Sequence, residues 1–195
     1  MNTWFHGVAN LTLAQKLTRR APWLRPGVVF YASLIPDAPL FVLTLWYFAV
    51  YGLNFGPAYD GFYYEHPLWI ISHNMFHAPI IIAAIAAAGF TLLRTDRGGG
   101  WPLSFAFGTG LHSLLDVVSH HDDGPLLFFP FDWSTRFTSP VSYWDPEHYG
   151  LWVMPAETVI TIVLSVYLIR RRRRTMKASA PRSPLRTRAS AARQD

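Results

Sequence analysis

The chain alternates long apolar runs with short polar segments. Four runs, at about residues 28–51, 68–93, 101–119 and 151–169, are rich in aliphatic and aromatic residues and carry few charges. At about 1.5 Å per residue, a helix over any of these runs is long enough to cross a bilayer core of about 30 Å. The pattern therefore predicts an all-α, polytopic membrane protein built as a four-transmembrane-helix bundle. A water-soluble all-α protein with buried helices is the alternative.

The positive charges predict how such a bundle is oriented. The segments outside the four runs hold 4, 0, 2, 1 and 10 Lys and Arg residues in chain order. Cytoplasmic segments of membrane proteins carry the excess of Lys and Arg, so this alternation predicts that both termini are cytoplasmic. It also places the long loop between the third and fourth runs on the outer side.

Composition limits the other possibilities. The last 26 residues hold 10 basic residues and 1 acid, which leaves 7 basic and 11 acidic residues in the rest of the chain, a net charge of −4. The basic character therefore belongs to a tail and does not indicate nucleic-acid binding. We expect one membrane domain over residues 1–169, with an interfacial N-terminal segment at 1–26, and a disordered basic cytoplasmic tail at 170–195.

Ionisable residues inside the apolar runs indicate a metal site. His112, Asp116 and His120 follow one another at four-residue spacing, which places them along one face of a helix. His73 and His77 repeat that spacing in the second run, and Asp37 follows Pro36 in the first. Ionisable residues are costly in a bilayer and usually face a bundle interior, so the predicted metal ligands are Asp37, His73, His77, His112 and Asp116. The alternative is that these residues only form hydrogen bonds that fix helix packing.

Because the chain has no cysteine, a metal must be bound by His, Asp or Glu. Imidazole and carboxylate ligands suit a divalent ion, zinc first, with manganese, iron or nickel as alternatives.

The outer loop offers candidates for acid–base chemistry. His120, His121 and Asp122 directly follow the predicted third helix, and one of them is expected to act as the general acid or base. Further along, Asp145, Glu147 and His148 are predicted either to supply further metal ligands or substrate contacts, or to form part of an ordered interfacial cap. His6 and His66 lie in polar or interfacial segments and are not expected in the site.

These residues resemble the bacterial membrane-bound metal-dependent hydrolase family in about half of the chain. The matching segments are Ser33-Leu-Ile-Pro-Asp37, Ser72-His-Asn-Met-Phe-His77 and His112-Ser-Leu-Leu-Asp116, with Pro125-Leu-Leu-Phe-Phe-Pro130 beyond them. The resemblance implies an inner-membrane protein with Asp37, His77, His112 and Asp116 as site residues. The chain departs from the family pattern at Pro39, where a second acid is common, and at Asn74-Met75, where an Arg-Gly pair is common.

The sequence thus predicts a metal-dependent hydrolase of the bacterial cytoplasmic (inner) membrane. Its partners would be the lipid bilayer and a lipid-like, amphiphilic substrate that is attacked by metal-activated water in the outer half of the bundle. The alternatives are a non-enzymatic metal or haem module, a small transporter, or a structural membrane protein without a site. A transporter predicts discontinuous helices in paired positions, and the sequence indicates only one such break, at Pro36 and Pro39.

Overall fold

The computed structural model describes residues 2–95 and 97–179, and this part of the chain is helical without a β-strand. The all-α prediction is therefore confirmed. Eight α-helices follow one another in the order α1 (Thr3–Leu17), α2 (Pro26–Ala32), α3 (Ala38–Tyr51), α4 (Pro57–Glu65), α5 (Pro67–Asn74), α6 (Pro79–Arg94), α7 (Gly100–Ser119) and α8 (Gly150–Ser179). A 3₁₀ turn, η1 (Pro146–His148), precedes α8.

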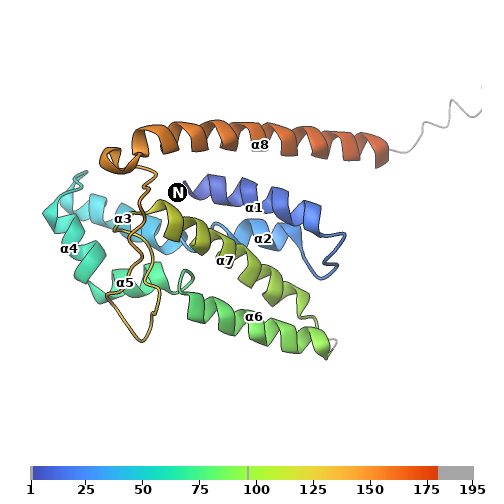
Figure 1. Ribbon diagram of the computed structural model, residues 1–195, viewed down its shortest axis with the longest axis horizontal. Helices are drawn as coiled ribbons and strands as arrows, with labels where there is room; N and C mark the ends of the chain where they lie inside the picture. Colours follow the sequence, from blue (N-terminus) through green and yellow to red (C-terminus); the bar gives the residue numbers. More distant parts are fainter. Residues whose placement is uncertain (1, 96, 180–195) are drawn as a thin grey trace, which may run out of the picture.

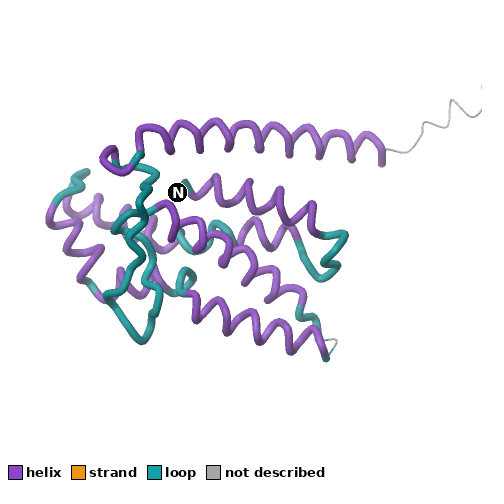
Figure 2. Tube along the Cα trace, viewed as in Figure 1, coloured by secondary structure: helices purple, strands orange, loops and turns teal. Residues whose placement is uncertain are grey.

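Most of the helices run along one common axis (Figure 1). α7 packs against α2 on one side and α6 on the other, while α1 packs between α2 and α8. α4 and the loop from residue 120 to 149 lie together at one end of the bundle (Figure 2), where Tyr63 of α4 donates a hydrogen bond to the Asp123 carbonyl. Polar groups of α4 and of the loop that follows α7 therefore meet at this end of the bundle.

Two of the predicted spans are broken helices. The run at 28–51 is interrupted between Ala32 and Ala38, and the run at 68–93 is interrupted between Asn74 and Pro79, where α5 and α6 are bent by 43°. Proline explains both positions, because it lacks an amide N–H and is favoured in the first turn of a new helix. Such breaks free backbone groups, which need partners if they are buried.

The described residues do not form four continuous spanning helices. Among them, α8 alone is long and apolar enough to cross a membrane, and α5 with α6 makes a second such segment if the bent pair is counted as one. α3 is apolar but shorter. α7 has nearly the predicted bounds, but it carries several buried polar residues that lower its hydropathy: Ser104, Thr109, His112, Ser113 and Asp116.

Both ends of the chain differ from the prediction. The N-terminal segment is not peripheral, because α1 buries Val8 and Ala14, and Ala14 packs with Leu24 and Val29. At the other end, α8 continues through the arginine run to Ser179, so residues 170–179 are helical rather than disordered. The remainder of the predicted tail, residues 180–195, lies outside the described residues.

Candidate metal centre

Four ligands from three parts of the chain meet beside the two helix breaks. Asp37 ends the break between α2 and α3, His77 lies in the break between α5 and α6, and His112 and Asp116 are one turn apart on α7. One ligand atom from each residue lies within 4.8 Å of the other three. The predicted convergence of these four residues is therefore confirmed.

The distances suit a small cation. His77 Nε2 lies 3.0 Å from His112 Nε2, 3.7 Å from Asp37 Oδ1 and 3.3 Å from Asp116 Oδ2. His112 Nε2 lies 3.3 Å from Asp37 Oδ1 and 2.9 Å from Asp116 Oδ2. For metal–ligand bonds of 2.0–2.1 Å, tetrahedral geometry separates neighbouring ligand atoms by about 3.3 Å. The five distances scatter around that value.

Hydrogen bonds from Nδ1 orient both imidazoles toward the centre. His112 Nδ1 lies 2.8 Å from the Ser33 carbonyl oxygen, and His77 Nδ1 lies 2.5 Å from the His73 carbonyl oxygen. A carbonyl only accepts, so Nδ1 carries a proton in both rings, and in the neutral tautomer each ring presents an Nε2 lone pair to the centre. Two lone pairs 3.0 Å apart repel each other unless a proton or a cation lies between them. This tautomer and this kind of backbone partner are typical of metal-binding histidines.

The helix breaks provide those carbonyls. Ser33 directly follows α2 and His73 lies in the last turn of α5, where carbonyls lack an intrahelical partner. A close approach of α2 to α7 brings Ser33 within reach of His112. It depends on Gly108, where a Cβ atom would lie 2.7 Å from the Val29 carbonyl oxygen. The breaks are thus part of the site.

Helix α1 supports both carboxylates from outside. The Thr3 hydroxyl donates to Asp37 Oδ2, and His6 Nε2 lies 3.0 Å from Asp116 Oδ1. The His6 ring is fully buried and stacks on the His112 ring with centroids 3.9 Å apart. The expectation that His6 lies outside the site is therefore wrong. The polar pair His6 and Asn10, spaced like His112 and Asp116, was the available signal; Asn10 donates to the Ser33 hydroxyl.

His120 contacts the cluster without joining it. Its Nε2 lies 3.5 Å from Asp116 Oδ1 and its Nδ1 lies 2.9 Å from Asp123 Oδ1. Burial alone lowers the pKa of His120, but hydrogen bonds to these two carboxylates outweigh it and raise the pKa above its ordinary value. For Asp123, burial raises the pKa, but the interactions that lower it, chiefly with His120, outweigh burial, and the pKa lies below its ordinary value. His120 therefore links the ligand Asp116 to the loop.

The other predicted site residues offer no ligand atom to the cluster. The His73 ring packs edge-on against the His77 ring, with centroids 4.6 Å apart, but its Nδ1 lies near the Tyr63 hydroxyl, and the His73 backbone carbonyl accepts from His77. His121 Nδ1 lies 2.6 Å from the Ser139 carbonyl oxygen, and Asp122 is exposed.

The three later candidates of the outer loop also remain outside the cluster. His148 Nδ1 lies 2.6 Å from Asp145 Oδ2, and Glu147 is exposed.

Access to the cluster is uneven. The side chains of His77 and His112 are completely buried and that of Asp116 is 6% exposed, whereas the Asp37 side chain is 17% exposed. An open coordination position, as catalysis requires, is therefore best placed on the Asp37 side.

No protein-family model, curated protein or solved structure matches the chain. The residues themselves, and their geometry, carry the functional interpretation.

Proposed function

We propose that the protein is a metal-dependent hydrolase of the bacterial cytoplasmic membrane. The observation that carries the proposal is the convergence of two buried Nε2 atoms and two carboxylate oxygens within 4.8 Å. Asp37, His77, His112 and Asp116 would hold one divalent ion. When bound, such an ion lowers the pKa of a coordinated water toward neutrality and polarises a carbonyl or phosphoryl oxygen.

The donor set favours an ion that accepts more than four ligands. Four protein ligands complete a tetrahedral zinc site, and closed zinc sites are structural rather than catalytic. Zinc would therefore need to expand to five ligands, while manganese, iron or nickel accept further ligands readily. The partly exposed Asp37 side is where we place water and substrate.

His120 is the best candidate for the general base or acid. It contacts Asp116 directly, while Nδ1 of His121 is engaged by the Ser139 carbonyl and Asp122 faces solvent. Its second nitrogen faces Asp123, whose other oxygen accepts from Trp144 Nε1 at 2.9 Å. A proton taken up at His120 would thus be stabilised by two carboxylates.

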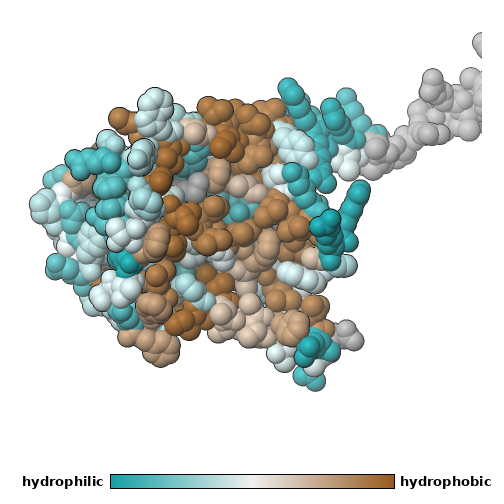
Figure 3. Space-filling model, in the orientation of Figure 1, coloured by the Kyte–Doolittle hydropathy of each residue, from teal (hydrophilic) through white to brown (hydrophobic). Residues whose placement is uncertain are grey.

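Exposed apolar side chains support the proposed membrane location. In this proposal, the four passes would be α2 with α3, α5 with α6, α7 and α8. Large apolar side chains of α3 and α8 are exposed, such as Val42, Leu45, Val159 and Ile162, each 58–68% exposed. Figure 3 shows hydrophobic residues across the middle of one face and hydrophilic residues toward both ends. A bilayer would cover this apolar middle, since soluble proteins rarely expose patches of such extent.

A lateral groove supports an amphiphilic substrate. It lies between α1 and α8, has a volume of about 290 Å³ and is lined by Phe5, Trp152, Val153, Ala156, Glu157 and Ile160. Glu157, 5% exposed, accepts a hydrogen bond from the Asn2 backbone amide, next to the Thr3 that contacts Asp37. Lipid-like molecules reach such a groove from the bilayer. We therefore propose an ester, phosphoester or amide of a lipid-like molecule as the substrate class.

A transporter is the second candidate, and the break between α5 and α6 favours it. Discontinuous helices meeting near the midplane are typical of transporter binding sites, and here two breaks meet at one cluster. Haem is disfavoured, because Asp37 and Asp116 oxygens occupy the flanks of the two imidazoles, where a porphyrin would lie.

The test is hydrolysis by detergent-purified protein of a panel of long-chain p-nitrophenyl esters and phosphodiesters in mixed micelles. We expect turnover that a chelator abolishes and a divalent metal restores, and a loss of at least about 100-fold in Asp116→Asn. Equal turnover in wild type and Asp116→Asn would contradict the hydrolase. Metal binding without turnover, together with metal flux into proteoliposomes, would support the transporter instead.

A further inference from the structure

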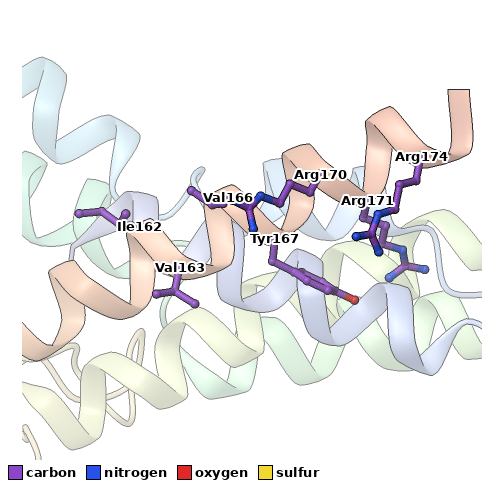
Figure 4. Close-up of a pocket in the computed structure, with 7 residues that line it drawn as sticks. All are labelled: Ile162, Val163, Val166, Tyr167, Arg170, Arg171 and Arg174. Carbon is purple, nitrogen blue, oxygen red and sulfur yellow. The ribbon is translucent and has the colours of Figure 1, made fainter. Parts of the chain in front are cut away.

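Three arginines and an apolar stripe form a groove along the middle and C-terminal part of α8. The groove has a volume of about 660 Å³ and is lined by Ile162, Val163, Val166, Tyr167, Arg170, Arg171 and Arg174. Figure 4 shows Arg171 and Arg174 projecting beside Tyr167, and Arg170 extending back along the helix over Val166. The groove is therefore apolar along one part and strongly cationic at its end.

Within residues 2–95 and 97–179, no carboxylate forms an ion pair with the arginines of this groove. The described ion pairs all join histidines to carboxylates, and none of them involves Arg170, Arg171 or Arg174. Guanidinium groups bind phosphate oxygens in a bidentate manner, and they do so more strongly where water is partly excluded. The cationic end thus fits a phosphate.

The apolar part fits the chains of the same ligand. Ile162 and Val163 are 58% and 59% exposed, and Val166 and Tyr167 are 39% and 42% exposed. They lie one to two turns before the arginines on α8, toward the middle of the helix. An amphiphile with an anionic phosphate at one end and hydrocarbon at the other matches this order.

We propose that this groove binds an anionic phospholipid of the leaflet that contacts the arginine end of α8. The proposal rests on α8 spanning a bilayer, and it does not depend on hydrolysis at the metal centre. The lipid phosphate contacts Arg170, Arg171 and Arg174, and its acyl chains cover Val163 and Val166. Such a lipid fixes the depth of α8.

The run of five arginines offers a matched control. Arg172 and Arg173 do not line the groove; on the helix, Arg172 points to the face opposite Arg170 and Arg174, and Arg173 lies toward the edge of the stripe. R170Q/R174Q and R172Q/R173Q remove the same charge from the same helix turn. A diffuse attraction of anionic lipid to a basic segment predicts equal losses for the two variants.

The test is native mass spectrometry of full-length protein in detergent, titrated with dioleoyl phosphatidylglycerol or dioleoyl phosphatidylcholine. We expect one phosphatidylglycerol to bind more tightly than phosphatidylcholine. R170Q/R174Q should weaken it roughly 25-fold, from about fivefold per arginine, and R172Q/R173Q clearly less. Equal losses in the two variants, or no preference for phosphatidylglycerol, would overturn the proposal.

Two further readouts complete the experiment. Glycerol 3-phosphate, which lacks chains, should compete poorly; competition equal to that of the lipid would show a free-phosphate site and overturn the proposal. Lipid-free melting temperatures of both variants should equal that of wild type, because the substituted side chains are exposed. Metal content and turnover, measured on the same samples, report separately on the proposed hydrolase.

Discussion

Two clusters of histidine and carboxylate lie near the same end of the protein, and they differ in what they can do. In the core cluster, His77 and His112 direct their Nε2 atoms at each other and at two carboxylates. In the loop cluster, His121 and His148 stack face to face with ring centroids 3.5 Å apart, and Asp145 accepts from the Nδ1 side of His148. Each cluster thus combines two imidazoles with at least one carboxylate.

The two clusters have similar residue types, and it is the direction and burial of the side chains that make the core cluster the candidate metal site. Because the two loop rings are stacked nearly parallel, their nitrogen atoms point outward within parallel planes and do not converge on a common point. They are also partly exposed; the His148 side chain is 29% exposed, whereas the core imidazoles are inaccessible. A buried cluster cannot exchange its partners for water, and an ion there offsets the cost of desolvated lone pairs.

The largest expected effect separates the two clusters directly. His112→Ala should lower divalent-metal affinity by more than about 100-fold, since loss of a supporting partner alone costs 10–100-fold. His148→Ala should leave the affinity unchanged. Isothermal titration of metal into chelator-stripped protein measures both, with melting temperature as the control for folding. Similar losses in the two variants would remove the distinction between core and loop.

A smaller effect is expected from the support that α1 gives to Asp116. His6→Phe keeps the ring against His112 but removes the nitrogen that contacts Asp116 Oδ1, so we expect roughly 10–100-fold weaker metal binding. His6→Gln, which retains a donor, should recover part of the affinity. A purely structural role for His6 would lower the melting temperature of both variants without this difference in metal affinity.

Thr3→Val tests the support of the other carboxylate. The substitution keeps the shape and removes the hydroxyl that donates to Asp37 Oδ2. A hydrogen bond to a charged group contributes about 1.5–3 kcal/mol. Because Asp37 is only half-buried, water can replace part of the lost hydrogen bond in Thr3→Val and reduce this cost. We expect metal affinity to fall about tenfold or less, again by titration. An effect larger than that of His6→Phe would reverse the assigned order.

The smallest effect concerns pH and the loop. The His148 contact lowers the pKa of Asp145 below its ordinary value. The contact therefore stabilises the loop above about pH 4 and is lost as the pH falls through the lowered folded-state value. As the pH is lowered, metal should leave the core before the loop contact is lost, because the imidazole ligands must be neutral to bind metal. Metal release followed from pH 8 to 3 should coincide in wild type and Asp145→Asn; a displaced curve would connect the two clusters.

The sequence predicted the core cluster because the residue spacing that indicates it is local in the chain. The four-residue spacing of His112 and Asp116 places both on one helix face whatever the tertiary structure, and α7 ends at Ser119 as expected. Pro36 indicated a disturbed helix before Asp37, and the structure resolves it as a break rather than a kink.

Three features of the structure were not predicted from the sequence. The contact of His6 with Asp116 joins residues 110 positions apart; the spacing of His6 and Asn10 indicates a shared polar helix face but does not identify the distant partner. The second break was hidden because hydropathy stays high across residues 68–93, although Pro79 could have marked the new helix start. The helical arginine run was missed because its composition resembles that of a disordered tail, whereas five arginines in fact continue α8 without a breaker.

The most direct test is X-ray absorption spectroscopy of the metal-loaded protein. Coordination by Asp37, His77, His112 and Asp116 predicts one ion per chain, with the scattering of two imidazoles and at least two oxygen ligands in its first shell. His112→Ala should reduce the signal to one imidazole or abolish binding, while His148→Ala should leave the spectrum unchanged. A spectrum without imidazole scattering, or one altered by His148→Ala and not by His112→Ala, would contradict a metal centre at these four residues.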